Sequence, residues 1–200
     1  MTTLSHRLAQ QIAFALEADK LKGILRQTWL TDQSRRENSA EHSWHVALMA
    51  VLLAEHAAAG PTLDVARVVR MMLVHDLVEI DAGDTLVYDD AAAADKTRRE
   101  RDAAQRIFGL LPDDQGEEFR AAWDEFEARR TPEARFAAAL DRVQPILHNF
   151  ATQGRAWRQH GVTAARVLEK NRHIADGSPA LWEFVRELVS DALARGYLEP

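Results

Sequence analysis

Hydrophobic residues recur along most of the chain three or four positions apart, which is the spacing of one face of an α-helix. Leu8, Ile12 and Leu16 follow this spacing near the N-terminus, and the run from Val46 to Leu53 follows it again. Stretches that alternate strictly between apolar and polar residues, as half-buried strands do, are hard to find. The pattern predicts an all-α protein.

Short polar, glycine-containing or proline-containing stretches divide this pattern into lengths typical of globular helices. We expect about eight helices between them. The breaks are TDQSRREN from Thr31, Gly60-Pro61, and residues 82–84, 112–114, 131–132 and 177–179.

Local signals mark where some of these helices begin and end. Ser39 is expected to cap the helix that follows it, and Thr131 is expected to begin another helix with Pro132 at its first position. Pro145 lies inside the second of these helices, and we expect it to bend that helix or to end it locally.

Composition narrows the class of protein. A chain of 200 residues, 46% of them hydrophobic, allows one well-buried core, so we expect a single domain over residues 1–200. The chain has no cysteine, which excludes disulfides and thiolate metal ligands and fits a reducing compartment. Any metal site must therefore use His, Asp or Glu.

The net charge and the N-terminal residues indicate where the protein is located and whether it binds nucleic acid or a membrane. The formal net charge is −6, and basic residues are mixed with acidic ones, so no basic face for nucleic acid stands out. The first 20 residues carry polar groups through their apolar positions, unlike a signal peptide or a membrane span. We expect a cytoplasmic protein that binds neither nucleic acid nor a membrane.

The densest group of polar residues in an apolar context is MMLVHDLVEIDAGD. On a helix, Glu79 lies three residues after Asp76 and four after His75, so all three side chains can face one point. An imidazole nitrogen and a carboxylate oxygen suit a divalent cation, whose charge offsets the desolvation of both groups. The alternative is a hydrogen-bonded His-Asp pair at a helix end.

Two further residues fit the same site. His42 begins a strongly amphipathic helix, one turn before the apolar residues that must face inward, and His45 is the second choice as a ligand from this helix. Asp141 directly follows an apolar run and is in phase with it, where a solvated charge is not expected. Its alternative role is an ion pair with Arg142.

The order of these residues is His42, then His75 and Asp76, then Asp141, which resembles the H…HD…D signature of the HD phosphohydrolase superfamily. The segments RRENSAEHSWHVALMA, LVHDLVEIDAGD and ALDRVQPILHN look like the branch that contains bacterial 5'-deoxynucleotidases and their eukaryotic HD-domain relatives. The resemblance covers about residues 20–150.

This resemblance implies an HD-type helical bundle with a metal-site core over residues 20–150 and one divalent metal ion on the four signature residues. The metal is Mn, Co, Fe, Zn, Ni or Mg. The implied activity is hydrolysis of a nucleoside 5'-monophosphate by a metal-activated water. Family members are commonly homodimers, so helices in residues 151–200 are expected to pack on the core or on a second subunit.

The resemblance also assigns roles beyond the metal ligands. Glu79 matches the catalytic Glu of the family's HDxxE segment, and Asp84 matches an acid that contacts the sugar and assists catalysis. Asp81 is the rival for either role, and Thr85 is expected to help hold the substrate. The alternatives are a solvated helix-end acid for Glu79 and a turn or capping residue for Asp84.

Among the expected substrate contacts, one residue matches the pattern of the family and two positions depart from it. Arg26 falls where the family carries an arginine that orients the phosphate, a task suited to a planar guanidinium. Gln27 falls where the deoxynucleotidases place a base-contacting tryptophan, and Trp29 comes two residues later. Residues 86–88 replace a proline-containing stretch that lines the sugar pocket. These departures leave base and sugar preference open.

The remaining histidines and tryptophans are assigned to structure. His148 lies seven residues after Asp141 and is expected to make a core hydrogen bond. The other histidines, His6, His56, His160 and His173, are expected to be surface or capping residues. The tryptophans expected in the core are Trp44, Trp123, Trp157 and Trp182.

Several other functions remain as alternatives. Residues 77–140 contain no histidine, which argues against the dinuclear cyclic-nucleotide phosphodiesterases of the superfamily. Another phosphate ester or a nucleotide polyphosphate is the alternative substrate of an HD phosphohydrolase. A metal-stabilised nucleotide-binding module without turnover has no use for Glu79 beside an open metal position. A helical interaction protein leaves the inward-facing His and Asp residues unexplained.

Overall fold

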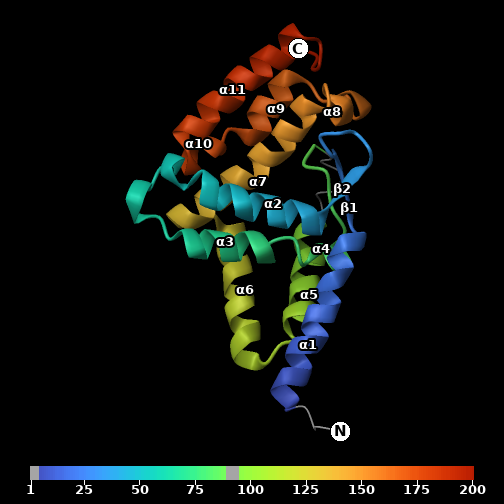
Figure 1. The fold of residues 1–200 in the computed structure, drawn as a ribbon, viewed down its shortest axis with the longest axis vertical. Coiled ribbons are helices and arrows are strands. Elements are labelled where there is room, and N and C mark those ends of the chain that lie inside the picture. The colour runs from blue at the N-terminus through green and yellow to red at the C-terminus, as the bar shows by residue number, and fades with distance from the viewer. Residues whose placement is uncertain (1–4, 89–94) are drawn as a thin grey trace.

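The computed structural model describes residues 5–88 and 95–200, and within them it confirms a mainly helical fold (Figure 1). The described part has eleven α-helical segments, of which eight have eight or more residues, matching the expected number of substantial helices. Their bounds are α1 (His6–Ala18), α2 (Ser39–Leu52), α3 (Val65–Val74), α4 (Glu79–Ala82), α5 (Lys96–Phe108), α6 (Asp113–Ala128), α7 (Pro132–Ala151), α8 (Arg155–Gln159), α9 (Ala164–Asn171), α10 (Ile174–Gly177) and α11 (Pro179–Ala194).

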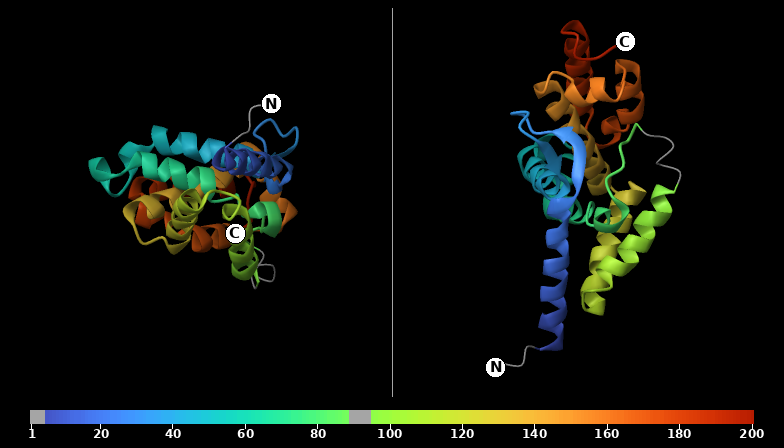
Figure 2. Two further views of the ribbon diagram at one scale, coloured as in Figure 1. Left: turned by 90° about the horizontal axis from the view of Figure 1, so that it is seen from below. Right: turned by 90° about the vertical axis from the view of Figure 1, so that its right-hand side faces the viewer.

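The long helix α7 runs through the middle of the molecule. Helices α2 and α3 pack on one part of it, and α10 and α11 pack on another. Phe136, Ala137 and Leu140 of α7 have no measurable exposure and form the centre of the larger hydrophobic core. Helices α1, α5 and α6 extend to the end of the molecule opposite the C-terminal helices and enclose a second core (Figure 2).

The C-terminal helices pack on the core of the same chain. Leu181 and Val185 of α11 are buried with Ile174 of α10 in the larger core. Of the two alternatives for residues 151–200, the structure therefore shows contact with the core of their own chain. Among the described residues, no helix is both long and apolar enough to cross a membrane.

The helix starts show one correct prediction and one error. Thr131 caps α7 by accepting a hydrogen bond from the amide of Ala134, and Pro132 is the first helical residue, as predicted. Helix α2 is capped by Asn38 rather than Ser39, because Asn38 forms a reciprocal capping box with Glu41. The predicted start is therefore one residue too late.

A small hairpin was not predicted. Strand β1 (Leu25–Trp29) pairs antiparallel with β2 (Arg36–Asn38), and the polar stretch from Thr31 forms the turn between them. The hairpin has only eight strand residues, and their side chains lack regular alternation. Pairing across the turn, rather than local pattern, therefore creates these strands.

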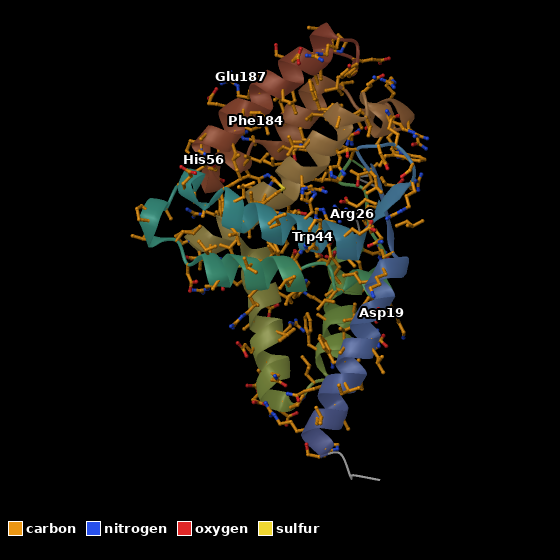
Figure 3. The ribbon with its side chains drawn as sticks, in the orientation of Figure 1. Asp19, Arg26, Trp44, His56, Phe184 and Glu187 are labelled. Carbon is orange, nitrogen blue, oxygen red and sulfur yellow. The ribbon has the colours of Figure 1, made fainter. Side chains whose placement is uncertain are left out.

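Two other expectations were wrong. Pro145 does not end α7, which continues to Ala151. Trp44 is 63% exposed on α2 instead of lying in the core (Figure 3). Trp123 and Trp157 are buried and Trp182 is partly buried against the core, as expected.

Candidate metal centre

Three elements bring the four signature residues together. His42 lies in the first turn of α2, where the Asn38 capping box fixes the start of the helix. His75 and Asp76 directly follow α3, and Asp141 lies in the middle of α7. All four residues are buried, and none has more than 7% of its surface exposed.

The ligand atoms of these residues face one another. His42 Nε2 lies 3.0 Å from Asp141 Oδ1 and 4.0 Å from Asp76 Oδ2. His75 Nε2 lies 3.1 Å from Asp76 Oδ1 and 3.6 Å from Asp141 Oδ1. His42, His75 and Asp76 each offer a ligand atom within 4.8 Å of the other two, as three ligands of one ion do. Asp141 Oδ1 adds a fourth donor beside both imidazole nitrogens.

Both histidines present an unprotonated nitrogen to this centre when neutral. His42 Nδ1 lies 3.1 Å from the amide oxygen of Gln144, and His75 Nδ1 lies 2.8 Å from the carbonyl oxygen of Met72. Each Nδ1 therefore carries a ring hydrogen, so in a neutral ring the lone pair is on Nε2. Without a metal, the Asp141 carboxylate at 3.0 Å can only accept from His42 Nε2, so a proton there takes the place of a cation. His75 Nε2 is buried and has no hydrogen-bond partner among the described residues. A cation satisfies both lone pairs.

The charges of the centre also favour a cation. Burial lowers the pKa of His75, but Asp76 and Asp141 outweigh it and raise the pKa to about 9. Burial raises the pKa of Asp141, yet Arg142 and the two histidines outweigh it and hold the pKa well below its usual range. Without a metal, protons supply the positive charge that these carboxylates require, so metal binding releases protons. Nitrogen and oxygen donors of this kind suit a divalent ion.

The HD segment is not one continuous helix. Helix α3 ends at Val74, and the amides of Leu77 and Glu79 bond to carbonyl groups three residues earlier before α4 begins. This tighter winding differs from the helix predicted for the segment. It still brings Glu79 to the same side as His75 and Asp76.

Glu79 is only 6% exposed, and its Oε2 accepts a hydrogen bond from Ser39 Oγ at 2.6 Å. Burial and the charge of Asp76 raise its pKa to about 8, although Arg26 and the Ser39 bond act in the opposite direction. A carboxyl group with a pKa near neutrality can both accept and donate a proton. The solvated helix-end alternative is therefore wrong for Glu79.

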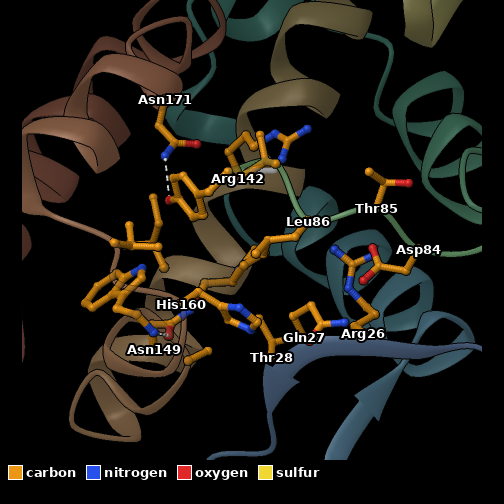
Figure 4. A pocket seen from close by; sticks show the side chains of 17 residues that line it. Arg26, Gln27, Thr28, Asp84, Thr85, Leu86, Arg142, Asn149, His160 and Asn171 are labelled. Atoms are coloured by element: carbon orange, nitrogen blue, oxygen red, sulfur yellow. Dashed lines mark hydrogen bonds and ion pairs between the residues drawn. The ribbon is translucent and has the colours of Figure 1, made fainter. Parts of the chain in front are cut away.

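Arg26 lies between the metal centre and the neighbouring acids. Its Nη1 donates to Asp76 Oδ2 at 2.9 Å and lies 4.0 Å from Asp84 Oδ1 (Figure 4). Burial disfavours its charge, but Asp76 and Asp84 outweigh burial and raise its pKa. Burial and Asp76 raise the pKa of Asp84, against the effect of Arg26. Both residues line a cavity beside the metal centre.

This cavity reaches from Arg26 to the C-terminal helices, and its lining residues bound about 610 Å³ of space that includes open solvent (Figure 4). Gln27 and Thr85, the expected substrate contacts, are among its lining residues, and Thr85 Oγ1 also lies 3.5 Å from Arg99 Nη2. The other lining residues are Thr28, Leu86, Val87, Tyr88, Arg142, Pro145, Ile146, Asn149, Ala156, Trp157, His160, Val162 and Asn171.

Three residues considered for the site lie elsewhere. Asp81 forms an ion pair with Arg106 on the surface. His45 is half-buried and contacts Gln144 rather than the metal centre. Trp29 is not among the residues that line the cavity, and its ring lies under Arg155, whose guanidinium carbon is 3.3 Å from the ring centre.

The sequence reasoning missed several buried polar residues around the ligands. Ser39 was assigned to capping but bonds Glu79, and Glu37 and Gln144 were not considered although they are 1% and 0% exposed. Gln144 follows Asp141 by three residues on the same helix, which was a usable signal. Glu37 carried no such signal, because its partners are distant in the sequence.

Comparisons of sequence relate the chain to known proteins. A model of the HD domain family matches residues 18–182. Human 5'-deoxynucleotidase HDDC2 is 31% identical over 147 residues, which cover 73% of this chain and 70% of the human protein. The Xenopus laevis protein of the same name is 33% identical over 129 residues, which cover 64% of this chain and 62% of that protein.

Comparisons with solved structures point to the same kind of protein as the sequence comparisons. A crystal structure of a protein named as a predicted metal-dependent phosphohydrolase, from Magnetospirillum magnetotacticum MS-1, matches with a TM-score of 0.92 and 58% identity over 97% of this chain and 96% of that one. The HD domain-containing protein YGK1 matches with a TM-score of 0.61 and 18% identity, over 96% of this chain and 89% of that one. The second match shows a shared fold alone.

Proposed function

The chain belongs to the HD domain family, as its motifs indicated, and on this basis we propose that it is a metal-dependent phosphohydrolase acting on a nucleoside 5'-monophosphate. The observation that carries the proposal is the meeting of two imidazole lone pairs and two carboxylates beside Glu79, a buried acid with a pKa of about 8. This centre adjoins a cavity that is lined by both apolar and polar side chains, as small-molecule sites are.

The proposed ligands are His42, His75, Asp76 and Asp141, which hold one divalent ion per chain. Such an ion polarises a phosphoryl oxygen and lowers the pKa of water. The chain's own residues position the substrate and move the proton. Mixed nitrogen and oxygen ligands accept Mn, Co, Fe, Zn or Ni, and Mg less readily.

Arg26 is the proposed phosphate-orienting residue. Its charge is retained in the buried site, because Asp76 and Asp84 raise its pKa. A guanidinium can hold two phosphate oxygens in one plane, which aligns the scissile bond with the attacking water. We assign proton transfer to Glu79, and we place Asp84 beside the sugar, where it can accept a hydrogen bond from a hydroxyl group.

The cavity supports a nucleoside rather than a small alcohol as the leaving group. Leu86, Ile146 and Trp157 offer apolar surface to a flat base, while Gln27 at the same cavity offers both a donor and an acceptor. The phosphate would lie at the Arg26 end. This arrangement supports one phosphate at the metal centre and the base toward the C-terminal helices.

The activity is tested by phosphate release from a panel of ribo- and deoxynucleoside 5'-monophosphates, using metal-stripped protein with divalent ions added back. We expect metal-dependent release that Glu79→Gln lowers by roughly 10²–10⁴-fold, because proton transfer is lost. Asp81→Asn is the matched control and should leave the rate unchanged, since Asp81 is paired with Arg106 away from the site.

Triphosphates and a generic phosphate ester belong in the same panel. Release from a triphosphate alone would replace the monophosphate proposal by a polyphosphate hydrolase. Tight metal binding without release from any substrate would contradict the enzyme proposal and favour a binding module.

We also propose that the chain forms a homodimer through α2. Trp44, Leu48 and Val51 lie on successive turns of this helix and are 50–63% exposed. Such a stripe on a surface helix is typical of a protein interface. A second copy of the same helix would cover it with an equivalent apolar stripe.

A further inference from the structure

A buried polar network lies on the side of His42 that faces away from the metal centre. Gln144 of α7 is its central residue, and Glu37 of β2 lies next to it. Neither side chain is more than 1% exposed. Burying an amide and a carboxylate in a small protein is costly, so their hydrogen bonds need an explanation.

Glu37 determines which end of the Gln144 amide faces His42. Glu37 Oε1 lies 2.6 Å from Gln144 Nε2, and a carboxylate can only accept at that distance. The amide nitrogen must therefore point to Glu37, which turns the amide oxygen to His42 Nδ1 at 3.1 Å.

An amide oxygen at Nδ1 requires that this nitrogen carry the imidazole hydrogen. The lone pair of a neutral His42 is then on Nε2, the atom that faces Asp141 and Asp76. A flipped amide would present its hydrogens to Nδ1 and move the ring hydrogen to Nε2. In that tautomer His42 cannot bind a metal through Nε2.

Glu37 is itself held in place from β1. Thr28 Oγ1 donates to Glu37 Oε2 at 3.1 Å, and Arg26 Nε lies 3.8 Å from the same oxygen. The hairpin therefore fixes the carboxylate that orients the amide.

A second cation site is the main alternative for this region. Ligand atoms of Glu37, His45 and His148 lie within 4.8 Å of one another, as three metal ligands would. However, Gln144 Nε2 is within hydrogen-bonding distance of all three, at 2.6, 3.3 and 3.1 Å. The amide hydrogens already occupy the space that a cation would take. The geometry around Gln144 therefore favours a hydrogen-bonding role over a second cation site.

We propose that Gln144 and Glu37 are positioning residues that hold His42 as the tautomer with its hydrogen on Nδ1, the form that binds the metal through Nε2. The proposal rests on the metal centre of the proposed function. It adds two residues, 107 positions apart in the sequence, that act on the metal without touching it.

The test compares wild-type protein with Gln144→Leu and Glu37→Gln. Leucine keeps the volume but removes the acceptor, and the Glu37→Gln amide accepts or donates, so it no longer enforces one orientation. We expect calorimetric titration of the metal-stripped proteins with Mn²⁺ to show roughly 10–100-fold weaker binding in both variants. His45→Gln is the control, because His45 contacts Gln144 but not His42, and should stay within twofold.

The tautomer itself is the second readout. Nitrogen-15 NMR of His42 in metal-stripped protein at pH 8 should show hydrogen on Nδ1 in the wild type and a mixture of tautomers in Glu37→Gln. A role limited to stability would not change this signal. If Gln144→Leu does not fold, Glu37→Gln alone decides, since it preserves the volume of the side chain.

Three results would overturn the proposal. Wild-type affinity and an unchanged tautomer in both variants would remove it and leave the metal centre intact. Two bound ions per chain, one of them lost in His45→Gln, would show that the network is a cation site. No metal binding by wild-type protein would overturn the metal centre and this proposal together.

Discussion

Asp76 links the two positive groups that the proposed reaction needs. One carboxylate oxygen accepts from Arg26 at 2.9 Å, and the other lies 3.1 Å from His75 Nε2. The same side chain therefore holds the phosphate-orienting cation beside the metal centre. Its charge also contributes to the raised pKa values of His75 and Glu79. One residue thus connects binding, proton transfer and metal ligation.

His173 gives a prediction at the same scale. It is the N-cap residue of α10, which agrees with its expected surface or capping role, but its side chain makes no capping hydrogen bond. Its Nε2 is buried without a hydrogen-bond partner in the described part of the chain. Burial, followed by the nearby charges of Arg129 and Arg142, lowers its pKa to about 4. The unfolded chain therefore binds more protons than the folded protein between about pH 4 and 6.5.

The free energy of unfolding of the metal-stripped protein should consequently rise with pH between about pH 4 and 6.5. Above this range, His173 should contribute no further increase. The slope should be smaller in His173→Gln, while exposed His160→Gln should match the wild type. Urea denaturation at several pH values measures these slopes. Equal slopes in all three proteins would show that His173 titrates normally.

At the scale of elements, the contact between α7 and α10 depends on a glycine. A Cβ atom on Gly177 would lie 2.3 Å from the carbonyl oxygen of Arg135 and 2.9 Å from the Cα atom of Phe136. Both neighbours belong to the backbone of α7 and cannot move aside as a flexible side chain can. The close approach of these helices therefore requires the absence of a side chain.

Gly177→Ala should lower the free energy of unfolding by roughly 1–3 kcal/mol, because the helices must separate. Gly23→Ala is the control, since a Cβ there meets no described atom within 4 Å and its φ is not positive. Chemical denaturation measures both variants. If Gly177→Ala lowers the free energy of unfolding no more than Gly23→Ala does, α10 can move away from α7 without cost.

Helix α7 shows why local signals were insufficient at this scale. Pro145 cannot donate to the carbonyl group of Asp141, and a proline inside a helix normally weakens it there. Packing on both sides of α7 outweighs this loss, because Asp141, Gln144 and His148 are buried and each lies beside a residue of another element. The helix therefore continues.

At the scale of the whole molecule, the exposed stripe on α2 predicts the oligomeric state. We expect the wild-type protein to be a dimer by light scattering and Val51→Glu to be a monomer that keeps the helical circular-dichroism signal of the wild type. A charge on an apolar interface is disfavoured, whereas Val51 is already 62% exposed within one chain. Leu16→Glu, on exposed α1, should remain a dimer. A monomeric wild type would contradict the proposed interface.

The sequence alone determined the features that depend on neighbouring residues. Helical periodicity predicted the fold class, and the Thr131-Pro132 pair located the start of α7 correctly, since capping involves residues at most a few positions apart. The order of His42, His75-Asp76 and Asp141 identified the family, because this motif is a pattern of residue types. The structure brings these four residues together.

Tertiary structure decided what depends on distant partners. The exposure of Trp44 follows from which face of α2 meets α7, and the hairpin follows from pairing across a turn. The orientation of the Gln144 amide follows from Glu37, which lies 107 positions earlier in the chain. Long-range packing sets the cost of burying each polar group, so only the folded chain decides which nitrogen of His42 faces the metal centre.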